Sequence, residues 1–178
     1  MTPSQGLCEP AVCPRPGPSI LVNRVRTFQG LGIATAVATY VTMVLGGYVA
    51  ATGAGLACPD WPTCRGSLVP DFARPGVLIE YVHRLCALMT AVLIGATAVC
   101  AFAWFRRERL ILLLASGSAG LLTIQILVGM LAITSRLDPL VVTAHLALAT
   151  ATFAATTAHA VVSRTLSAPR SIAPAGPA

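Results

Sequence analysis

The sequence predicts an all-α protein, a bundle of four transmembrane helices with both chain ends on the cytoplasmic side. Hydrophobic residues make up 56% of the 178 residues and charged residues only 10%, whereas a soluble domain carries about a quarter charged residues. The mean hydropathy is +0.78. Four apolar runs are each long enough to cross a hydrocarbon layer of roughly 30 Å. These observations place the chain in a membrane and leave no room for a soluble core.

The chain is expected to begin with a disordered cytosolic arm over residues 1–26. This stretch holds five prolines and two cysteines and shows no apolar periodicity. Cys8 and Cys13 have no histidine beside them, so a pair of reduced thiols without a metal is the simplest interpretation.

A transmembrane domain is predicted over residues 27–163. The loop at 52–76 is rich in Gly, Pro and Asp and is too polar to cross the membrane. The helices before and after it have the length that a bilayer requires. They are predicted at residues 28–51, 77–104, 110–134 and 139–162. Residues 164–178 are rich in Ala, Pro and Ser and are expected to form a disordered cytosolic tail.

The distribution of arginine predicts the orientation. With both termini inside, the inner segments hold eight arginines and the outer loops hold three. Cytoplasmic segments carry the excess of positive charge in membrane proteins, so the 52–76 loop is expected to face outward. The arginines lie between apolar runs and form no patch, which argues against a nucleic acid partner.

Three ionisable side chains gather at the start of the second helix. Glu80, His83 and Arg84 are three and four residues apart, so all three share one helix face. Charged groups at membrane depth usually face a cavity, a partner or a ligand. The alternative is an interfacial cluster in which Glu80 pairs with Arg84 and His83 reaches the lipid headgroups.

A second histidine is expected at the same depth. His83 lies six residues after Val77, and His145 lies six residues after Pro139. At 1.5 Å per residue, both imidazoles lie roughly 9 Å below the outer boundary. Two histidines at one depth on different helices are the usual arrangement for bis-imidazole heme ligation. The alternative is that each histidine makes one interhelical hydrogen bond. His159 lies about 21 Å deeper and is interpreted as an interfacial residue outside this pair.

The remaining cysteines divide between a loop and a helix. Cys58 and Cys64 lie on the outer loop, where an oxidising compartment permits a disulfide and two prolines favour a tight turn. Such a pair is either structural or active in thiol exchange. Cys86 and Cys100 are about 21 Å apart along one helix, so they cannot pair and are interpreted as core residues.

Together these motifs resemble the heme A synthase family. The resemblance rests on the run TGAGLACPDWPTC at 52–64, the E-x-x-H-R run at 80–84, the Q-x-x-x-G pattern at 125–129 and PLVVTAH at 139–145. It covers residues 28–162. It implies an oxidoreductase in a prokaryotic cell membrane, surrounded by lipid, that oxidises a methyl group of heme O to the formyl group of heme A for terminal oxidases. Heme b is the implied cofactor.

The resemblance also implies roles for individual residues. Glu80 matches the essential carboxylate, and His83 and His145 match ligands of the heme iron. Arg84 would pair with Glu80 or meet a heme propionate. Family members usually have eight helices, and this chain resembles their N-terminal, catalytic half because it has Glu80. A homo-oligomer would supply the other half by symmetry, and the enzyme that produces heme O is an expected partner.

Two other functions remain open. A non-catalytic heme carrier or oxidase assembly partner would keep both histidines but would not need Glu80. A membrane thiol–quinone oxidoreductase would share the size and the outward cysteines. Such an enzyme needs a second cysteine pair, which the turn at 135–138 lacks.

Overall fold

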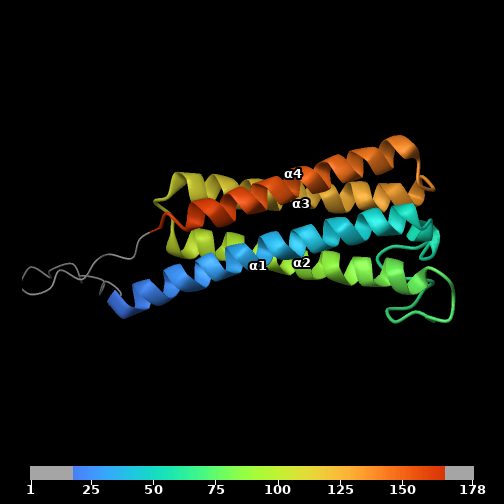
Figure 1. Ribbon diagram of the computed structural model, residues 1–178, viewed down its shortest axis with the longest axis horizontal. Coiled ribbons are helices and arrows are strands. Elements are labelled where there is room, and N and C mark those ends of the chain that lie inside the picture. The colour runs from blue at the N-terminus through green and yellow to red at the C-terminus, as the bar shows by residue number, and fades with distance from the viewer. Residues whose placement is uncertain (1–17, 167–178) are drawn as a thin grey trace, which may run out of the picture.

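Four long helices lie side by side in the computed structural model, which describes residues 18–166 (Figure 1). Their order is α1 (Pro18–Ala51), η1 (Ala54–Leu56), α2 (Val77–Trp104), α3 (Arg109–Thr134) and α4 (Pro139–Ser163), where η1 is a short 3₁₀ helix. All four long helices have the length and apolar composition to cross a membrane, and the described residues form no β-sheet. The predicted all-α polytopic bundle is confirmed.

The start of α2 and the start of α4 are fixed by local chemistry. Gly76 precedes α2 with a φ of 78°, a left-handed conformation that glycine adopts without steric cost. Asp138 precedes α4, and its side chain accepts hydrogen bonds from the backbone amides of Leu140 and Val141. Pro139 occupies the first turn, where its missing N–H is not needed. The predicted starts at residues 77 and 139 are therefore confirmed.

The first helix is longer than the sequence analysis predicted. α1 begins at Pro18, so residues 18–26 are helical and the assignment of the whole 1–26 stretch to a disordered arm was wrong. A proline is compatible with the first turn of a helix, which explains why a helix can begin there. Arg24 lies over the ring of Trp104 at 5.8 Å and joins this extension to α2. Cys8, Cys13 and the predicted tail beyond Leu166 lie outside the described residues.

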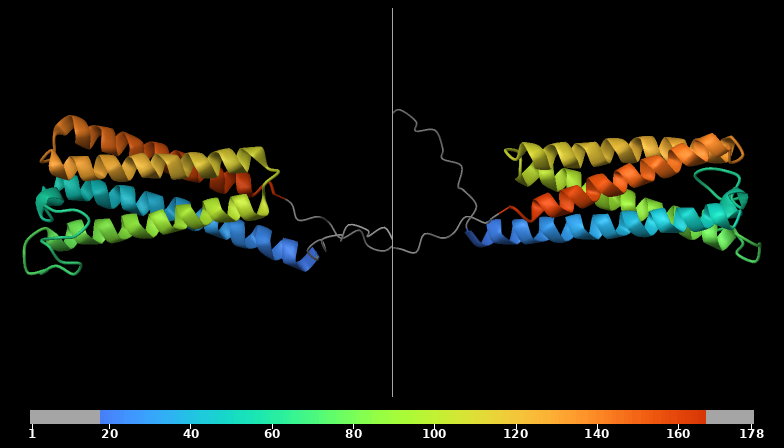
Figure 2. Two further views of the ribbon diagram at one scale, coloured as in Figure 1. Left: turned by 180° about the vertical axis from the view of Figure 1, so that it is seen from behind. Right: turned by 45° about the horizontal axis from the view of Figure 1, so that its top comes forward.

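The helices form two antiparallel hairpins, α1–α2 and α3–α4. α1 packs against α2 and α4, and α3 packs against the same two helices, with α2 and α3 packing least extensively. α1 projects beyond the other helices at the end where the described chain begins and finishes (Figure 1 and Figure 2). The opposite end holds the α1–α2 loop and the α3–α4 turn (Figure 1). We call it the loop end.

Hydroxyl groups occupy much of the interior. The buried polar side chains include Thr35, Thr39, Thr90, Thr97, Ser118, Thr152 and Thr156. Two hydroxyl pairs join α1 to α2: Thr35 to Thr97 at 3.0 Å and Thr42 to Thr90 at 2.8 Å. In lipid the hydrophobic effect does not drive helices to associate, so close packing takes its place. Small and hydroxylated residues allow that close packing.

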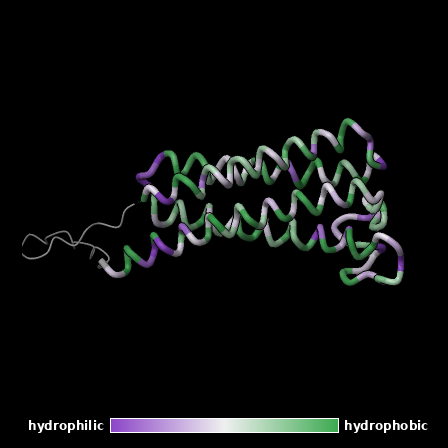
Figure 3. Tube along the Cα trace, in the orientation of Figure 1, coloured by the Kyte–Doolittle hydropathy of each residue, from purple (hydrophilic) through white to green (hydrophobic). Residues whose placement is uncertain are grey.

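The outer surface matches a lipid environment. Large apolar side chains such as Leu88, Val92, Val99 and Leu113 are exposed along the helices. Hydrophilic residues gather toward the two ends of the bundle, leaving the middle apolar (Figure 3). This distribution is the one that a membrane-spanning bundle requires, so we describe the chain as a multi-pass membrane protein.

Candidate functional site

The structure brings the two predicted histidines to one level of the bundle. His83 lies six residues after the first residue of α2, and His145 lies six residues after the first residue of α4. Both helices start at the loop end (Figure 1). In each ring Nδ1 is buried and has no hydrogen-bond partner among the described residues.

A glycine on the preceding helix lies against each imidazole. A methyl group at Gly46 of α1 would lie 2.9 Å from Cε1 of His83. A methyl group at Gly129 of α3 would lie 2.9 Å from Cε1 of His145. Nε2 of His145 is also 3.4 Å from Nε2 of Gln125. Each imidazole therefore fits closely against the glycine of the preceding helix.

The chemistry of these residues fits a heme. A buried polar nitrogen without a partner is costly, so the two imidazoles call for a ligand that uses them. Residues 18–166 contain no group of three or more side chains that could hold a metal ion alone. The macrocycle of a heme supplies the equatorial ligands of its iron and requires only axial ones from the protein. His83 and His145 are the residues that would provide them.

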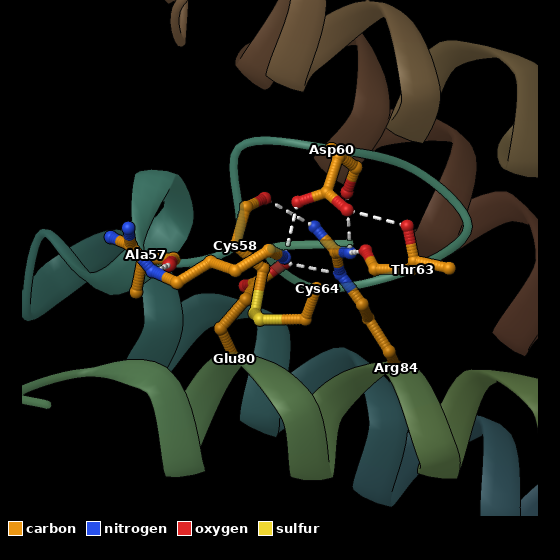
Figure 4. Close-up of polar contacts among 8 residues, drawn as sticks. Ala57, Cys58, Asp60, Thr63, Cys64, Glu80 and Arg84 are labelled. Carbon is orange, nitrogen blue, oxygen red and sulfur yellow. Dashed lines mark hydrogen bonds and ion pairs between the residues drawn. A yellow bond between two sulfur atoms is a disulfide. The ribbon is translucent and has the colours of Figure 1, made fainter. Parts of the chain in front are cut away.

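Arg84 connects the second helix to the loop above it (Figure 4). Its Nε donates to Oε1 of Glu80 at 2.9 Å. Its Nη1 donates to the carbonyls of Asp60 at 2.8 Å and Thr63 at 2.6 Å, and its Nη2 donates to the carbonyl of Cys58 at 2.7 Å. All three guanidinium nitrogens thus have partners within the chain. The predicted pairing with Glu80 is present, and three loop carbonyls accept bonds from three of the four other N–H groups.

Glu80 is buried beneath the loop. Its exposed fraction is 4%, and its only ion pair among the described residues is the one with Arg84. It lies three residues before His83 on the same helix, and residues at this spacing share a face. Oε2 takes no part in the ion pair. The structure therefore places a buried carboxylate, with one oxygen outside its salt bridge, about one helical turn from the histidine.

The loop itself is closed by a disulfide and organised by Asp60. Cys58 and Cys64 are joined, and both are buried against Val77 at the start of α2. The carboxylate of Asp60 accepts a hydrogen bond from the Thr63 hydroxyl (Figure 4) and others from the backbone amides of Arg65 and Gly66. These bonds turn the backbone so that its carbonyls face Arg84. Sequence reasoning missed this role, because the acceptors of Arg84 are backbone atoms.

The hydrogen bonds to Asp60 predict how the loop responds to acid. The bond from Thr63, with those from Gly66 and Arg65, lowers the pKa of Asp60 to about 2 from an ordinary value of 3.8. A lowered pKa means that the ionised carboxylate stabilises the loop above pH 4, and that this stabilisation is lost as the pH falls toward 2. Fluorescence of the exposed neighbour Trp61 should therefore stay constant down to about pH 4 and change below it.

Replacing Asp60 with Asn should remove this acid transition, because the amide does not titrate. Asp71→Asn is the matched control, since Asp71 lies on the same loop and accepts one bond, from the backbone amide of Ala73. An unchanged transition in Asp60→Asn would contradict the role given to Asp60.

His159 is not where the sequence analysis placed it. Its exposed fraction is 2%, so it is a core residue and the interfacial interpretation was wrong. Its ring meets Phe28 edge-on at 5.1 Å, and Nδ1 lies 3.4 Å from a methyl group built at Gly32. It belongs to the opposite end of α4 from His145, so it stays outside the histidine pair. Cys86 and Cys100 are partly buried free thiols on α2.

Comparison with known proteins identifies the family. The model of the cytochrome oxidase assembly protein family COX15-CtaA matches residues 29–176. The chain belongs to this family. The resemblance to heme A synthases seen in the sequence is thereby confirmed.

Individual relatives match only in part. The heme A synthase of Shouchella clausii is 31% identical over 91 residues, covering 51% of this chain and 30% of that protein. The heme A synthase of Geobacillus kaustophilus is 28% identical over 131 residues, covering 73% and 41%. The protoheme IX farnesyltransferase of Haloarcula marismortui is 35% identical over 123 residues, covering 69% and 26%. The chain spans less than half the length of these curated relatives.

Proposed function

We propose that this protein is a heme A synthase, which oxidises a methyl group of heme O to the formyl group of heme A. The observation that carries the proposal is the buried ion pair of Glu80 and Arg84 one helical turn from His83. A heme carrier needs the two histidines and has no use for a buried carboxylate beside them. Membership in a family whose relatives are named heme A synthases supports the same choice.

His83 and His145 would hold a heme. Heme b would be the cofactor of the reaction and heme O its substrate. Bound heme would supply the redox-active iron that the oxidation requires. With water as the source of the formyl oxygen, the oxidation releases protons and electrons. Glu80 would accept and release the protons at Oε2, and the electrons would pass to an external acceptor. Arg84 would keep that carboxylate in place and balance its charge. Four of its five N–H groups have partners within the chain, which leaves one N–H of Nη2 to meet a heme propionate.

The surroundings of the site complete the proposal. Some relatives are named protoheme IX farnesyltransferase, which supports a heme-modifying enzyme as the partner that delivers heme O. The described arginines outnumber acidic residues at the end opposite the loop, so we place both termini in the cytoplasm of a prokaryotic cell and the disulfide loop outside. A second copy of the bundle would supply a second histidine pair, and a homo-oligomer is therefore part of the proposal.

Co-expression with a source of heme O tests the reaction. The full chain should produce heme A, detected by chromatography and mass measurement of the extracted hemes, whereas cells without it should accumulate heme O. A protein that binds heme and leaves heme O unconverted would be a carrier, and the proposed reaction would then be wrong. A wild-type protein that binds no heme, and whose activity is lost when the Cys58–Cys64 pair is replaced, would instead favour a thiol oxidoreductase.

A further inference from the structure

The two hairpins hold their histidines in the same way. His83 of α2 lies against Gly46 of α1. His145 of α4 lies against Gly129 of α3, and its Nε2 is 3.4 Å from Nε2 of Gln125. In both hairpins the nearest ring atom to the glycine of the first helix is Cε1 of the histidine on the second helix.

We propose that Gly46 and Gly129 are positioning residues that fix the two imidazoles for heme ligation. The inference rests on the proposed function, because it assigns a task to the same histidine pair. A methyl group at either glycine would lie 2.9 Å from Cε1 of the ring, whereas carbon atoms in contact are about 3.5–4.0 Å apart. Only a residue without a side chain leaves the ring where it is.

Replacing either glycine with alanine should displace the histidine side chain without unfolding the bundle. The atom that meets the added methyl group belongs to the end of a histidine side chain, which can rotate away. At both positions the three atoms nearest to the methyl group, at 2.9–3.6 Å, all belong to the histidine ring. Displacement of the imidazole therefore relieves the overlap, and the helix pair need not separate.

Other glycines of the same helices lack this contact. A methyl group at Gly47, next to Gly46, meets nothing within 4 Å, and the same is true at Gly120 on α3. Alanine at Gly47 or Gly120 therefore adds a methyl group that touches no histidine. Gly47→Ala and Gly120→Ala are therefore matched controls, with the same chemical change on the same helices.

Titration of the purified, heme-free full chain with heme b tests the inference. We expect Gly46→Ala and Gly129→Ala to bind heme roughly 10–100-fold more weakly, the loss typical of groups that orient metal ligands. Their low-spin signals in electron paramagnetic resonance should also shift, because ring orientation affects the iron. Gly47→Ala and Gly120→Ala should match the wild type in affinity and signal. Thermal unfolding of the heme-free proteins should be similar for all five.

Two results would overturn the inference. The first is wild-type affinity and signal in both Gly46→Ala and Gly129→Ala. The second is an equal loss of affinity in all four variants that follows a loss of thermal stability, since general packing would then explain it. A wild-type chain that binds no low-spin heme would refute the proposed function itself. Heme binding by the wild type is therefore measured before any variant is compared with it.

Discussion

Replacement of Glu80 with Gln should reduce heme A formation by roughly 10²–10⁴-fold, the contribution of an acid–base group. Glutamine keeps the size of the side chain and can still accept a bond from Arg84, but it has no titratable proton. The carboxylate is buried and its Oε1 is held at 2.9 Å by Arg84, so water cannot readily replace it. Heme binding should be retained, because the ligands are two histidines.

Extracted hemes from cells co-expressing a heme O source would show the effect as accumulated heme O. Glu108→Gln is the matched control, since Glu108 is exposed and lies between α2 and α3 at the far end of the bundle. Normal heme A in the Glu80→Gln protein would exclude the carboxylate from the chemistry. Loss of heme from this protein would instead point to a structural role.

Replacement of His83 or His145 with Ala should abolish low-spin heme in the purified protein. Two neutral imidazoles give a strong ligand field, and loss of either leaves the iron five-coordinate or unbound. Absorption and electron paramagnetic resonance spectra would show the change directly. The two variants should have similar spectra, because the two ligands have equivalent roles.

His159→Ala separates ligation from packing. His159 is buried against Phe28 and Gly32, so its removal leaves a cavity and should lower the melting temperature. The spectrum of any bound heme should nevertheless remain low-spin. If all three histidine variants lose heme to the same extent, the assignment of His83 and His145 as the ligand pair is wrong.

Much of the bundle could be predicted because its signals are local. Apolar runs give the spans, and Gly76, Asp138 and Pro139 mark the starts of α2 and α4. Once those starts are known, the rise of a helix places His83 and His145 at one depth. The candidate pair therefore needed no tertiary information.

Other features depend on neighbours that a single sequence does not reveal. The helical residues 18–26 follow a proline-rich stretch, and composition alone favoured disorder there. The burial of His159 depends on which face of α4 meets α1. The partners of Arg84 are carbonyls of the Cys58–Cys64 loop, and backbone acceptors leave no trace in side-chain patterns. The contacts of Gly46 with His83 and of Gly129 with His145 were also missed. They depend on how neighbouring helices pack, and the residues around the two glycines differ.

Side-chain hydrogen bonds between helices are distributed unevenly around the bundle, so some helix pairs are held together more firmly than others. Thr35–Thr97 and Thr42–Thr90 join α1 to α2, and Gln125 meets His145 between α3 and α4, but no such bond joins α2 to α3 among residues 18–166. The α2–α3 contact is also the least extensive of the neighbouring pairs. Side-chain hydrogen bonds of Gln29 and Thr150 also join α1 to α4. Parting α2 from α3 therefore disrupts fewer interactions than parting any other pair of neighbouring helices. The bundle therefore opens most easily along its α2–α3 side, while α1 and α4 keep the two histidine-bearing hairpins joined.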